Sequence, residues 1–242
     1  MTRREMLRQM GAVSLLAMAD VSWGVTPGRA KPFVKWAGGK GQLLGQLDAL
    51  LPRDLAKARG LTYVEPFVGG GAMLFHVLTR YPNIERVVIN DLNADLIATY
   101  RAVKTSPQAL IACLGKHQAA YDACADEAAR KAYYLAQRTL YNTQKEDAVE
   151  SAARFIFLNR TGFNGLYRVN SKGEYNVPFG KAKRPRICDE ATLLADSALL
   201  QKVEILCGDF EGVSGHLSGK VFLYFDPPYR CLLYTSPSPR DA

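Results

Sequence analysis

The stretch YFDPPY, which ends at Tyr229, carries the residues best suited to chemistry. Its two consecutive prolines restrict the backbone, so Asp226 and Tyr229 are held in a set relation to each other. The Asp226 carboxylate and the Pro227 carbonyl can each accept a hydrogen bond from an amine, and Tyr229 can stack on the ring that carries it. A nucleobase amine fits this description, although a base in a duplex must flip out of its stack to reach such a loop. Taken alone, the motif would favour an ordinary strand-ending aspartate before a Pro-Pro turn.

Three consecutive glycines, Gly69, Gly70 and Gly71, stand where an apolar run gives way to a helical pattern. Glycine lets the backbone approach a ligand because it has no Cβ. Asp91 follows the next apolar run about 20 residues further on, where nucleoside-binding sheets place a carboxylate against ribose hydroxyls. Together these residues indicate a cofactor that contains adenosine. The glycine cluster alone could equally be a tight strand-to-helix turn.

A second glycine turn, KWAGGK, is bracketed by Trp36 and Lys40. It is not a P-loop, because Val34 occupies the position of the first glycine and Gly41 that of the final serine or threonine. A cationic Lys40 beside an aromatic ring and free backbone amides could instead hold a carboxylate, such as that of an amino-acid moiety. A turn capped by a surface lysine is the simpler alternative.

Alternating strands and helices must position these motifs. The segment LTYVEPFVGGGAMLFHVLTR predicts a strand, a glycine turn and a helix, and IERVVINDLNADLIATYRAVK repeats the scheme with a strand over Val87–Ile89. The segments KVEILCGDF and KVFLYFDPPY return to the strand-then-turn pattern. Strands separated by helical segments imply a parallel sheet of the doubly wound type. The first helix is predicted from apolar residues at helical spacing, namely Met73, Leu74, Val77 and Leu78.

The middle of the chain has a different character. Residues 107–150 are rich in alanine and predict helix, with Pro107 placed to open it. From Ala153 to Arg186 the sequence combines aromatic, glycine and basic residues, and we expect a loop-rich stretch there.

The composition is that of a globular protein with a polyanionic partner. The 242 residues are 48% hydrophobic and 22% charged, which is enough for one substantial core. Lys and Arg number 31 against 23 Asp and Glu, a formal net charge of +8 that favours partners such as nucleic acid. Scattered cysteines without a paired CxxC spacing indicate reduced thiols rather than a metal site. They are Cys113, Cys124, Cys188, Cys207 and Cys231.

The N-terminus carries twin arginines, Arg3 and Arg4, before a short apolar run that resembles an export signal. The run is too short to span a membrane, which takes about 20 apolar residues. An upstream extension translated from a wrongly chosen start is the alternative.

Five segments occur here in the order in which they occur in the bacterial and phage DNA adenine methylase (Dam-like) family: KPFVKWAGGKGQLL, VEPFVGGGAMLF, INDLNADLI, FLNRTGFNGLYRVNSKGEYNVPFG and YFDPPYR. The chain resembles that family over nearly everything from Lys31 to Arg230. The resemblance implies an α/β fold with a Rossmann-like, S-adenosylmethionine-dependent methyltransferase sheet and a helical, loop-rich target-recognition insertion. The expected divisions are a non-family extension 1–30, core 31–104, insertion 105–187, core 188–230 and a non-family tail 231–242.

The resemblance also implies residue roles. S-adenosylmethionine would donate a methyl group to the exocyclic amine of a flipped DNA adenine by in-line displacement, and no metal is needed because the leaving group is a neutral thioether. The expected catalytic residues are Asp226, Pro227 and Tyr229. The expected cofactor-binding residues are Trp36, Lys40, Phe67, Gly69, Gly70, Gly71, Asp91, Asp209, Phe210 and Asp226.

The basic, aromatic stretch would recognise the target, which we expect to be a GATC-like site in double-stranded DNA. Phe163 would wedge between bases, and Arg168 would read a base edge, that of a guanine. The other basic residues would contact phosphates, although an exposed loop of solvated charges is the plainer reading. The expected DNA-binding residues are Arg160, Phe163, Asn164, Arg168, Lys181 and Lys183.

Two other functions compete with this one. An RNA or protein amine methyltransferase could use the same kind of D-P-P-Y loop, although the segment NRTGFNGLYR argues against it. A catalytically incomplete DNA-binding remnant is the third, because family members continue past DPPY whereas CLLYTSPSPRDA has no pattern that could supply further strands. We therefore expect a sheet truncated at its C-terminus, and on this third reading the chain would have little or no activity. A DNA substrate places the protein in the cytoplasm, and we expect a monomer with no membrane partner.

Overall fold

The structure is a computed structural model that describes residues 29–145 and 147–227. The predictions for Tyr229, for the twin arginines and for the tail 231–242 fall outside these residues. Within the described part of the chain, no helix combines the length and the apolar character that crossing a bilayer requires.

Four parallel strands form one sheet in the order β3-β2-β1-β4. The bounds are β1 (Leu61–Glu65), β2 (Arg86–Ile89), β3 (Val203–Ile205) and β4 (Lys220–Leu223). The register pairs Tyr63 of β1 with Val87 of β2 and with Phe222 of β4. Because all four strands run the same way, their carboxyl ends meet at a single edge. The predicted α/β fold with a parallel sheet is confirmed.

The two faces of the sheet are covered differently. Tyr63 and Val87 point into the main core, whereas Val64 and Val88 point to the opposite face. There they pack with Val213 of the short helix η3 (Phe210–His216) in a small separate cluster. The alternation follows from the two-residue period of a strand.

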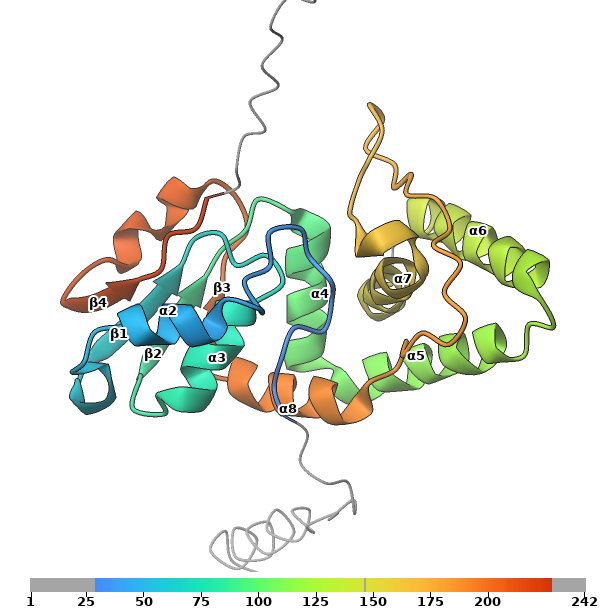
Figure 1. The fold of residues 1–242 in the computed structure, drawn as a ribbon. Helices are drawn as coiled ribbons and strands as arrows, with labels where there is room; N and C mark the ends of the chain where they lie inside the picture. The colour runs from blue at the N-terminus through green and yellow to red at the C-terminus, as the bar shows by residue number, and fades with distance from the viewer. Residues whose placement is uncertain (1–28, 146, 228–242) are drawn as a thin grey trace, which may run out of the picture.

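Helices α3 (Ala72–Arg80), α4 (Ala94–Thr105) and α8 (Glu190–Leu200) cover the main face. Helix α2 (Leu44–Leu50) packs against α3, and the short helix η1 (Leu55–Lys57) adds Leu55 to the core. Figure 1 shows the sheet at one side of the molecule, α5, α6 and α7 at the other, and α4 between them. The apolar residues that predicted the first helix, Met73, Leu74, Val77 and Leu78, are all buried in α3.

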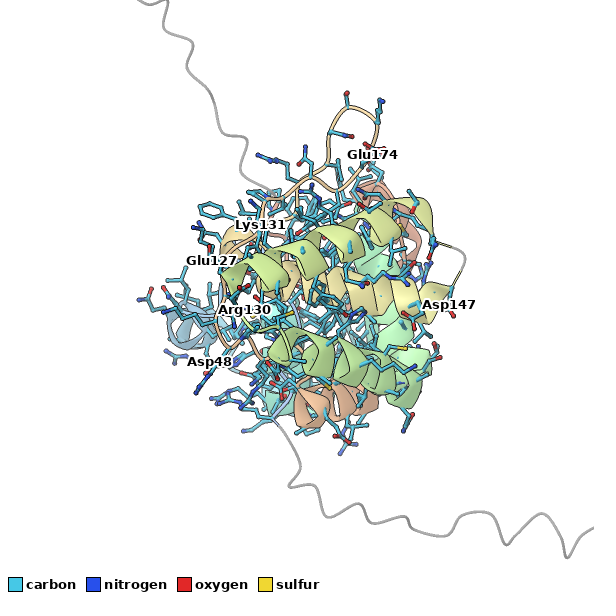
Figure 2. The ribbon with its side chains drawn as sticks, turned by 90° about the vertical axis from the view of Figure 1, so that its right-hand side faces the viewer. Asp48, Glu127, Arg130, Lys131, Asp147 and Glu174 are labelled. Atoms are coloured by element: carbon cyan, nitrogen blue, oxygen red, sulfur yellow. The ribbon has the colours of Figure 1, made fainter. Side chains whose placement is uncertain are left out.

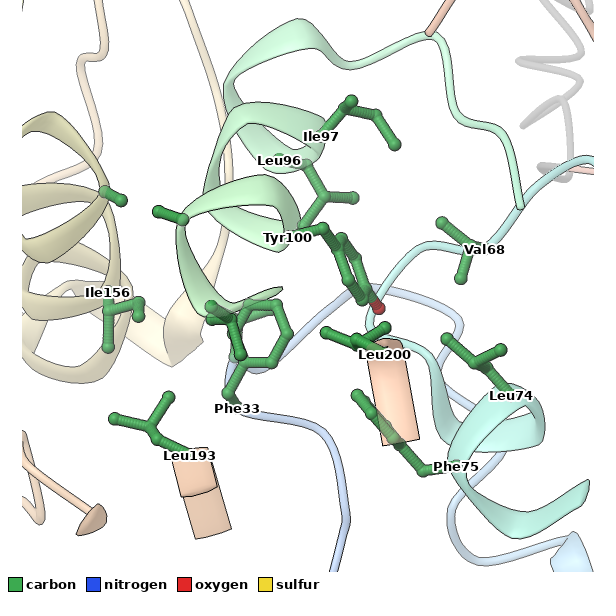
Figure 3. Packing of buried hydrophobic residues seen from close by; sticks show 14 of the residues in the cluster. Phe33, Val68, Leu74, Phe75, Leu96, Ile97, Tyr100, Ile156, Leu193 and Leu200 are labelled. Carbon is green, nitrogen blue, oxygen red and sulfur yellow. The ribbon is translucent and has the colours of Figure 1, made fainter. Parts of the chain in front are cut away.

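Phe33 fastens the N-terminal segment to the core. Its side chain is 2% exposed, and its ring lies edge-on to Tyr100 of α4 at 4.8 Å. Figure 3 shows Phe33 surrounded by core residues that come from α3, α4, α7 and α8. Burial of a side chain of this size contributes about 1.5–3 kcal/mol. The chain that leads to Trp36 is therefore anchored three residues before it.

The region predicted to be helical forms three helices, α5 (Pro107–Asp122), α6 (Glu127–Thr143) and α7 (Ala148–Thr161). Pro107 stands in the first turn of α5, and the side chains of Asp126 and Asp147 cap α6 and α7. Figure 2 looks onto this side of the molecule, where α6 carries the charged residues Glu127, Arg130 and Lys131.

The expectation of a loop-rich stretch from Ala153 was wrong for its first nine residues. Residues 153–161 continue α7, which packs between α4, α5 and α6. Ala153, Ile156 and Phe157 are buried at helical spacing, and this periodicity is hidden in the sequence because aromatic and basic residues lie between them.

Irregular backbone begins at Gly162 and runs to Asp189. It contains the short helix η2 (Phe163–Gly165) and two isolated bridges, Gly162 to Phe179 and Val169 to Tyr175. Asn142 of α6 holds it by accepting a hydrogen bond from the Tyr175 amide at 2.9 Å and donating one to the Tyr175 carbonyl at 3.1 Å. The divisions at residues 104, 187 and 230 stay a prediction.

Candidate active site

A cavity of about 410 Å³ opens at the carboxyl edge of the sheet. The segments that follow β1, β2 and β4 form three of its walls, and the turn from Trp36 to Lys40 forms the fourth. The predicted catalytic residue Pro227 lines the cavity, and so do most of the predicted cofactor-binding residues. They are Trp36, Lys40, Phe67, Gly69, Gly70, Gly71, Asp91 and Asp226.

The glycine turn after β1 has a backbone that only glycine suits. Gly69 and Gly71 adopt φ angles of 49° and 77°, in the left-handed region. A Cβ on Gly69 would stand 2.8 Å from Cδ1 of Trp36, which covers the turn. The Tyr100 hydroxyl lies behind the turn and donates a hydrogen bond to the Gly69 carbonyl at 3.0 Å. The predicted close approach of backbone to the cavity therefore has a geometric basis.

Asp91 stands at the end of β2, facing that turn. Its Oδ2 accepts a hydrogen bond from the Gly69 amide at 3.0 Å, and its Oδ1 accepts one from the Asn93 amide at 2.9 Å. These two bonds fix the carboxylate against the cavity, because each oxygen is held by a different backbone segment. Each oxygen keeps lone-pair capacity for a further donor.

Glu65 is a cavity residue that the sequence analysis missed. It is the last residue of β1, is 3% exposed and accepts a hydrogen bond from the Tyr63 hydroxyl at 2.7 Å. Burial raises its pKa to about 8, with the nearby Asp226 and Asp91 adding to the rise and the Tyr63 hydrogen bond opposing it. Glu65 is therefore mostly protonated at neutral pH. An acidic residue at the end of a strand that is otherwise uncharged was the available signal.

Asp226 lies three residues after the end of β4, and the Tyr224 amide extends the strand pairing by donating to the Val64 carbonyl at 2.9 Å. Its Oδ2 lies 2.6 Å from Nζ of Lys40, which also donates to the Gly38 carbonyl at 3.1 Å. Besides Glu65, whose neutral form burial favours, the lining holds two aspartates, Asp91 and Asp226, against the single lysine Lys40. The cavity therefore suits a ligand that carries positive charge.

Trp36 forms the wall between the cavity and the helical side of the molecule. Its ring is stacked on Tyr167 with 5.7 Å between centroids and lies 6.3 Å from Phe155 of α7. Tyr167 in turn donates a hydrogen bond from its hydroxyl to Asp95 of α4 at 3.0 Å. The wall is thus supported from two helices.

Asp209 and Phe210 lie beside the cavity rather than in its lining. The Asp209 side chain caps η3 by accepting from the Glu211 amide at 3.0 Å. Phe210 is 40% exposed, and its ring is 5.6 Å from that of Phe67, which does line the cavity. Their role in cofactor binding stays a prediction.

A second, smaller cavity of about 190 Å³ is strongly basic. The predicted DNA-binding residue Arg160 reaches it from α7 and donates to the Phe33 carbonyl at 2.8 Å. Burial lowers the pKa of Arg160, and its Nε has no hydrogen-bond partner among the described residues. Lys35, which the sequence analysis did not single out, lines the same cavity. The remaining charged lining comes from Lys183, Arg184 and Arg186.

The other predicted DNA-binding residues lie on exposed parts of the irregular segment. Phe163 is 49% exposed, and Asn164 beside it has a left-handed φ of 52°. Arg168 donates from Nε to the Asn176 side chain at 2.7 Å and from Nη2 to the Asn176 carbonyl at 3.1 Å. Lys181 forms an exposed ion pair with Glu127 at 3.2 Å. No group of His, Cys, Asp and Glu in the described residues is arranged to hold a metal ion.

A parallel sheet whose strand ends enclose a glycine turn, a fixed carboxylate and the pair Asp226 and Pro227 has the arrangement of a nucleoside-binding α/β protein. The model of the D12 class N6 adenine-specific DNA methyltransferase family matches residues 36–237, and the chain belongs to this family. The predicted resemblance is thereby confirmed, and the chain is a methyltransferase.

Individual relatives agree with this assignment. The chain is 48% identical over 208 residues to the Type II methyltransferase M.MjaIII of Methanocaldococcus jannaschii, covering 85% of this chain and 71% of the relative. It is 37% identical over 209 residues to the DNA adenine methylase of Vibrio cholerae, covering 86% and 68%. It is 37% identical over 201 residues to the DNA N-6-adenine-methyltransferase of Escherichia phage P1, covering 82% and 24%.

Proposed function

We propose that this protein transfers a methyl group from S-adenosylmethionine to the exocyclic amine of a flipped adenine in duplex DNA, at a GATC-like site. The observation that carries the proposal is the single cavity at the sheet edge. It brings Trp36, the glycine turn and Asp91 together with Asp226 of the D-P-P loop. A cofactor-type wall and an amine-binding loop thus share one space.

The cavity residues fit S-adenosylmethionine. The volume of the cavity, about 410 Å³, lies in the range of about 300–1,000 Å³ that is usual for small-molecule sites. Asp91 would accept hydrogen bonds from ribose hydroxyls, the Trp36 ring would lie against the methionine part, and the surplus negative charge would favour a cationic ligand. When bound, S-adenosylmethionine supplies an electrophilic methyl group on a positively charged sulfur.

Asp226 and Pro227 would orient the target amine. The Asp226 carboxylate and the Pro227 carbonyl both accept hydrogen bonds, so two N–H groups of one amine can bind side by side and the nitrogen lone pair is set toward the cavity. Lys40 holds Asp226 Oδ2 at 2.6 Å, so the amine can bind Oδ1 or the remaining lone pair of Oδ2. Tyr229 would stack on the base.

The basic cavity and the irregular segment would bind the DNA. Arg160 lines this cavity together with Lys183, Arg184 and Arg186, a group of cations that phosphate oxygens would pair with. Lys181, Lys183 and Asn164 would add backbone contacts and hold the duplex in register. Phe163 would take the place of the flipped base, and Arg168 would read a guanine from the major groove.

The test is methyl transfer from labelled S-adenosylmethionine to a short duplex that contains GATC. We expect label in that duplex, little in a duplex with the four bases permuted, and none with Asp226→Ala. RNA and bulk protein serve as competing acceptors. Label in either acceptor instead of DNA would refute the substrate, and label that survives Asp226→Ala would refute the role of the D-P-P loop.

A further inference from the structure

Asn159 makes three hydrogen bonds from a nearly sealed position in the last turns of α7. It is 2% exposed. Its Oδ1 accepts from the Lys35 amide at 2.8 Å, and its Nδ2 donates to the Lys35 carbonyl at 2.8 Å. The second Nδ2 hydrogen goes to the Gly165 carbonyl, also at 2.8 Å. One side-chain amide therefore joins two backbone segments that are far apart in the sequence.

The first of these segments separates the two cavities. Trp36 lines the cavity at the sheet edge, and Lys35, the residue before it, lines the basic cavity. Asn159 uses both backbone hydrogen-bonding groups of Lys35, much as a neighbouring strand would. The peptide between the two cavities is thereby tied to α7.

The second segment is the start of the irregular stretch that would contact DNA. Gly165 follows the exposed Phe163 by two residues, and its φ of 64° brings its backbone against Lys35. A Cβ on Gly165 would stand 2.6 Å from Cβ of Lys35. Two residues further on, Tyr167 stacks on Trp36. The segment that carries Phe163 thus lies directly on the wall that carries Trp36.

We propose that Asn159 is a positioning residue that couples cofactor binding to DNA recognition. This inference rests on the proposed function and adds a communication between its two sites. A ligand in the sheet-edge cavity restrains Trp36 and the Lys35 peptide. Asn159 passes that restraint to the Gly165 carbonyl and so to the segment with Phe163. A second ligand then meets an element that is already ordered, which gives positive cooperativity.

The test measures the dissociation constant of a fluorescent GATC duplex with and without saturating S-adenosylhomocysteine, which occupies the cavity without reacting. We expect the wild-type chain to bind the duplex about fivefold tighter or more when the analogue is present. In Asn159→Ala and in the isosteric Asn159→Asp, the ratio of the two constants should fall close to one. A loss of stability alone does not change this ratio, because both constants are measured on folded protein.

Asn142 provides a matched control. It binds the amide and the carbonyl of Tyr175 in the same paired manner, but none of its hydrogen bonds reaches Lys35 or Gly165. Asn142→Ala should keep the wild-type ratio. If both Asn159 variants fail to fold, Gly165→Ala tests the same contact, because its Cβ would push against Lys35, and it should also lower the ratio.

Three outcomes would overturn the proposal. The first is a ratio of one in the wild-type chain. The second is a wild-type ratio in the folded Asn159 or Gly165 variants. The third is a ratio in Asn142→Ala that falls as far as it does in the Asn159 variants. If the wild-type chain methylates the duplex, none of these three outcomes counts against the proposed function. If the wild-type chain binds the duplex about fivefold tighter with the analogue but does not methylate it, the proposed chemistry is wrong and the coupling stands.

Discussion

Two buried carboxyl groups hold their protons more tightly in this fold than they would in water. Glu65 at the cavity and Asp196 in the core both have a pKa raised to about 8, chiefly because burial disfavours the charged form. Asp196 is fully buried on α8, and its Oδ1 accepts from the Lys31 amide at 3.0 Å. That bond and the charge of Lys31 lower its pKa, whereas Asp189 raises it further.

Asp196 should make the protein less stable as the pH rises. Its ordinary pKa is 3.8, so between about pH 4 and pH 8 the folded chain holds a proton that the unfolded chain has lost. The free energy of unfolding should therefore fall by up to about 1.4 kcal/mol per pH unit in that window. Asp196→Asn should match the wild type near pH 4 and exceed it at pH 8, as measured by urea unfolding. A difference that does not vary with pH would contradict the assignment.

Gly71 and Gly173 allow the glycine turn to be tested against a matched site. Their φ angles are 77° and 76°, so alanine costs the same backbone strain at both, about 1–2 kcal/mol. Only Gly71 is crowded: a Cβ there would meet the Tyr100 hydroxyl and stand 3.1 Å from Phe75, whereas Gly173 faces open space. Gly71→Ala should lower the urea midpoint more and weaken cofactor binding. Equal midpoints for the two variants would show that the turn tolerates a side chain.

At the scale of elements, the strand-turn-helix units could be predicted because their periodicity is local. The apolar spacing of α3 and the run Val87–Ile89 each appear within a few residues. Helix α7 was partly missed because its apolar face is interrupted by aromatic and basic residues. Asn159 and Lys35 escaped notice for another reason: their contact spans 124 residues, and no local pattern signals it.

The irregular segment should separate base contacts from phosphate contacts. Arg168 is oriented by two hydrogen bonds to Asn176, whereas Lys181 forms an ion pair with Glu127 at the surface. Arg168→Ala should cost about 1–3 kcal/mol at the preferred site and relax specificity there. Lys181→Ala should weaken binding to all duplexes alike and lower the salt slope by about one. Anisotropy titrations at several salt concentrations would measure both, and identical losses on every sequence would remove Arg168 as a base reader.

The whole molecule joins a sheet and a group of helices through one continuous core, which runs from β1 through α4 to α7. The site residues come from segments spread between Trp36 and Pro227, so they assemble only when this core forms. This is why the sequence could predict most of the cavity lining from motifs, but not the ion pair of Lys40 with Asp226 or the burial of Glu65.

Ligand binding in the cavity should therefore stabilise the entire fold. S-adenosylmethionine at about 100 times its dissociation constant should add roughly 2.7 kcal/mol, which for a chain of this size raises the Tm by about 5–10 °C. Differential scanning fluorimetry would record the shift. The Tm of Asp91→Ala should not shift when the ligand is added. A wild-type chain whose Tm also does not shift would count against the assigned cofactor site.

The position of Trp36 also gives the protein an optical property. The sequence has two tryptophans, and the other, Trp23, lies outside the described residues. A Trp23→Phe variant would emit from Trp36 alone, whose indole lies against the Tyr167 ring and over the glycine turn. The fluorescence of Trp36 should change when a ligand binds in the sheet-edge cavity and when DNA binds on the other side of the wall. Stopped-flow fluorescence would therefore give the order in which the two ligands bind.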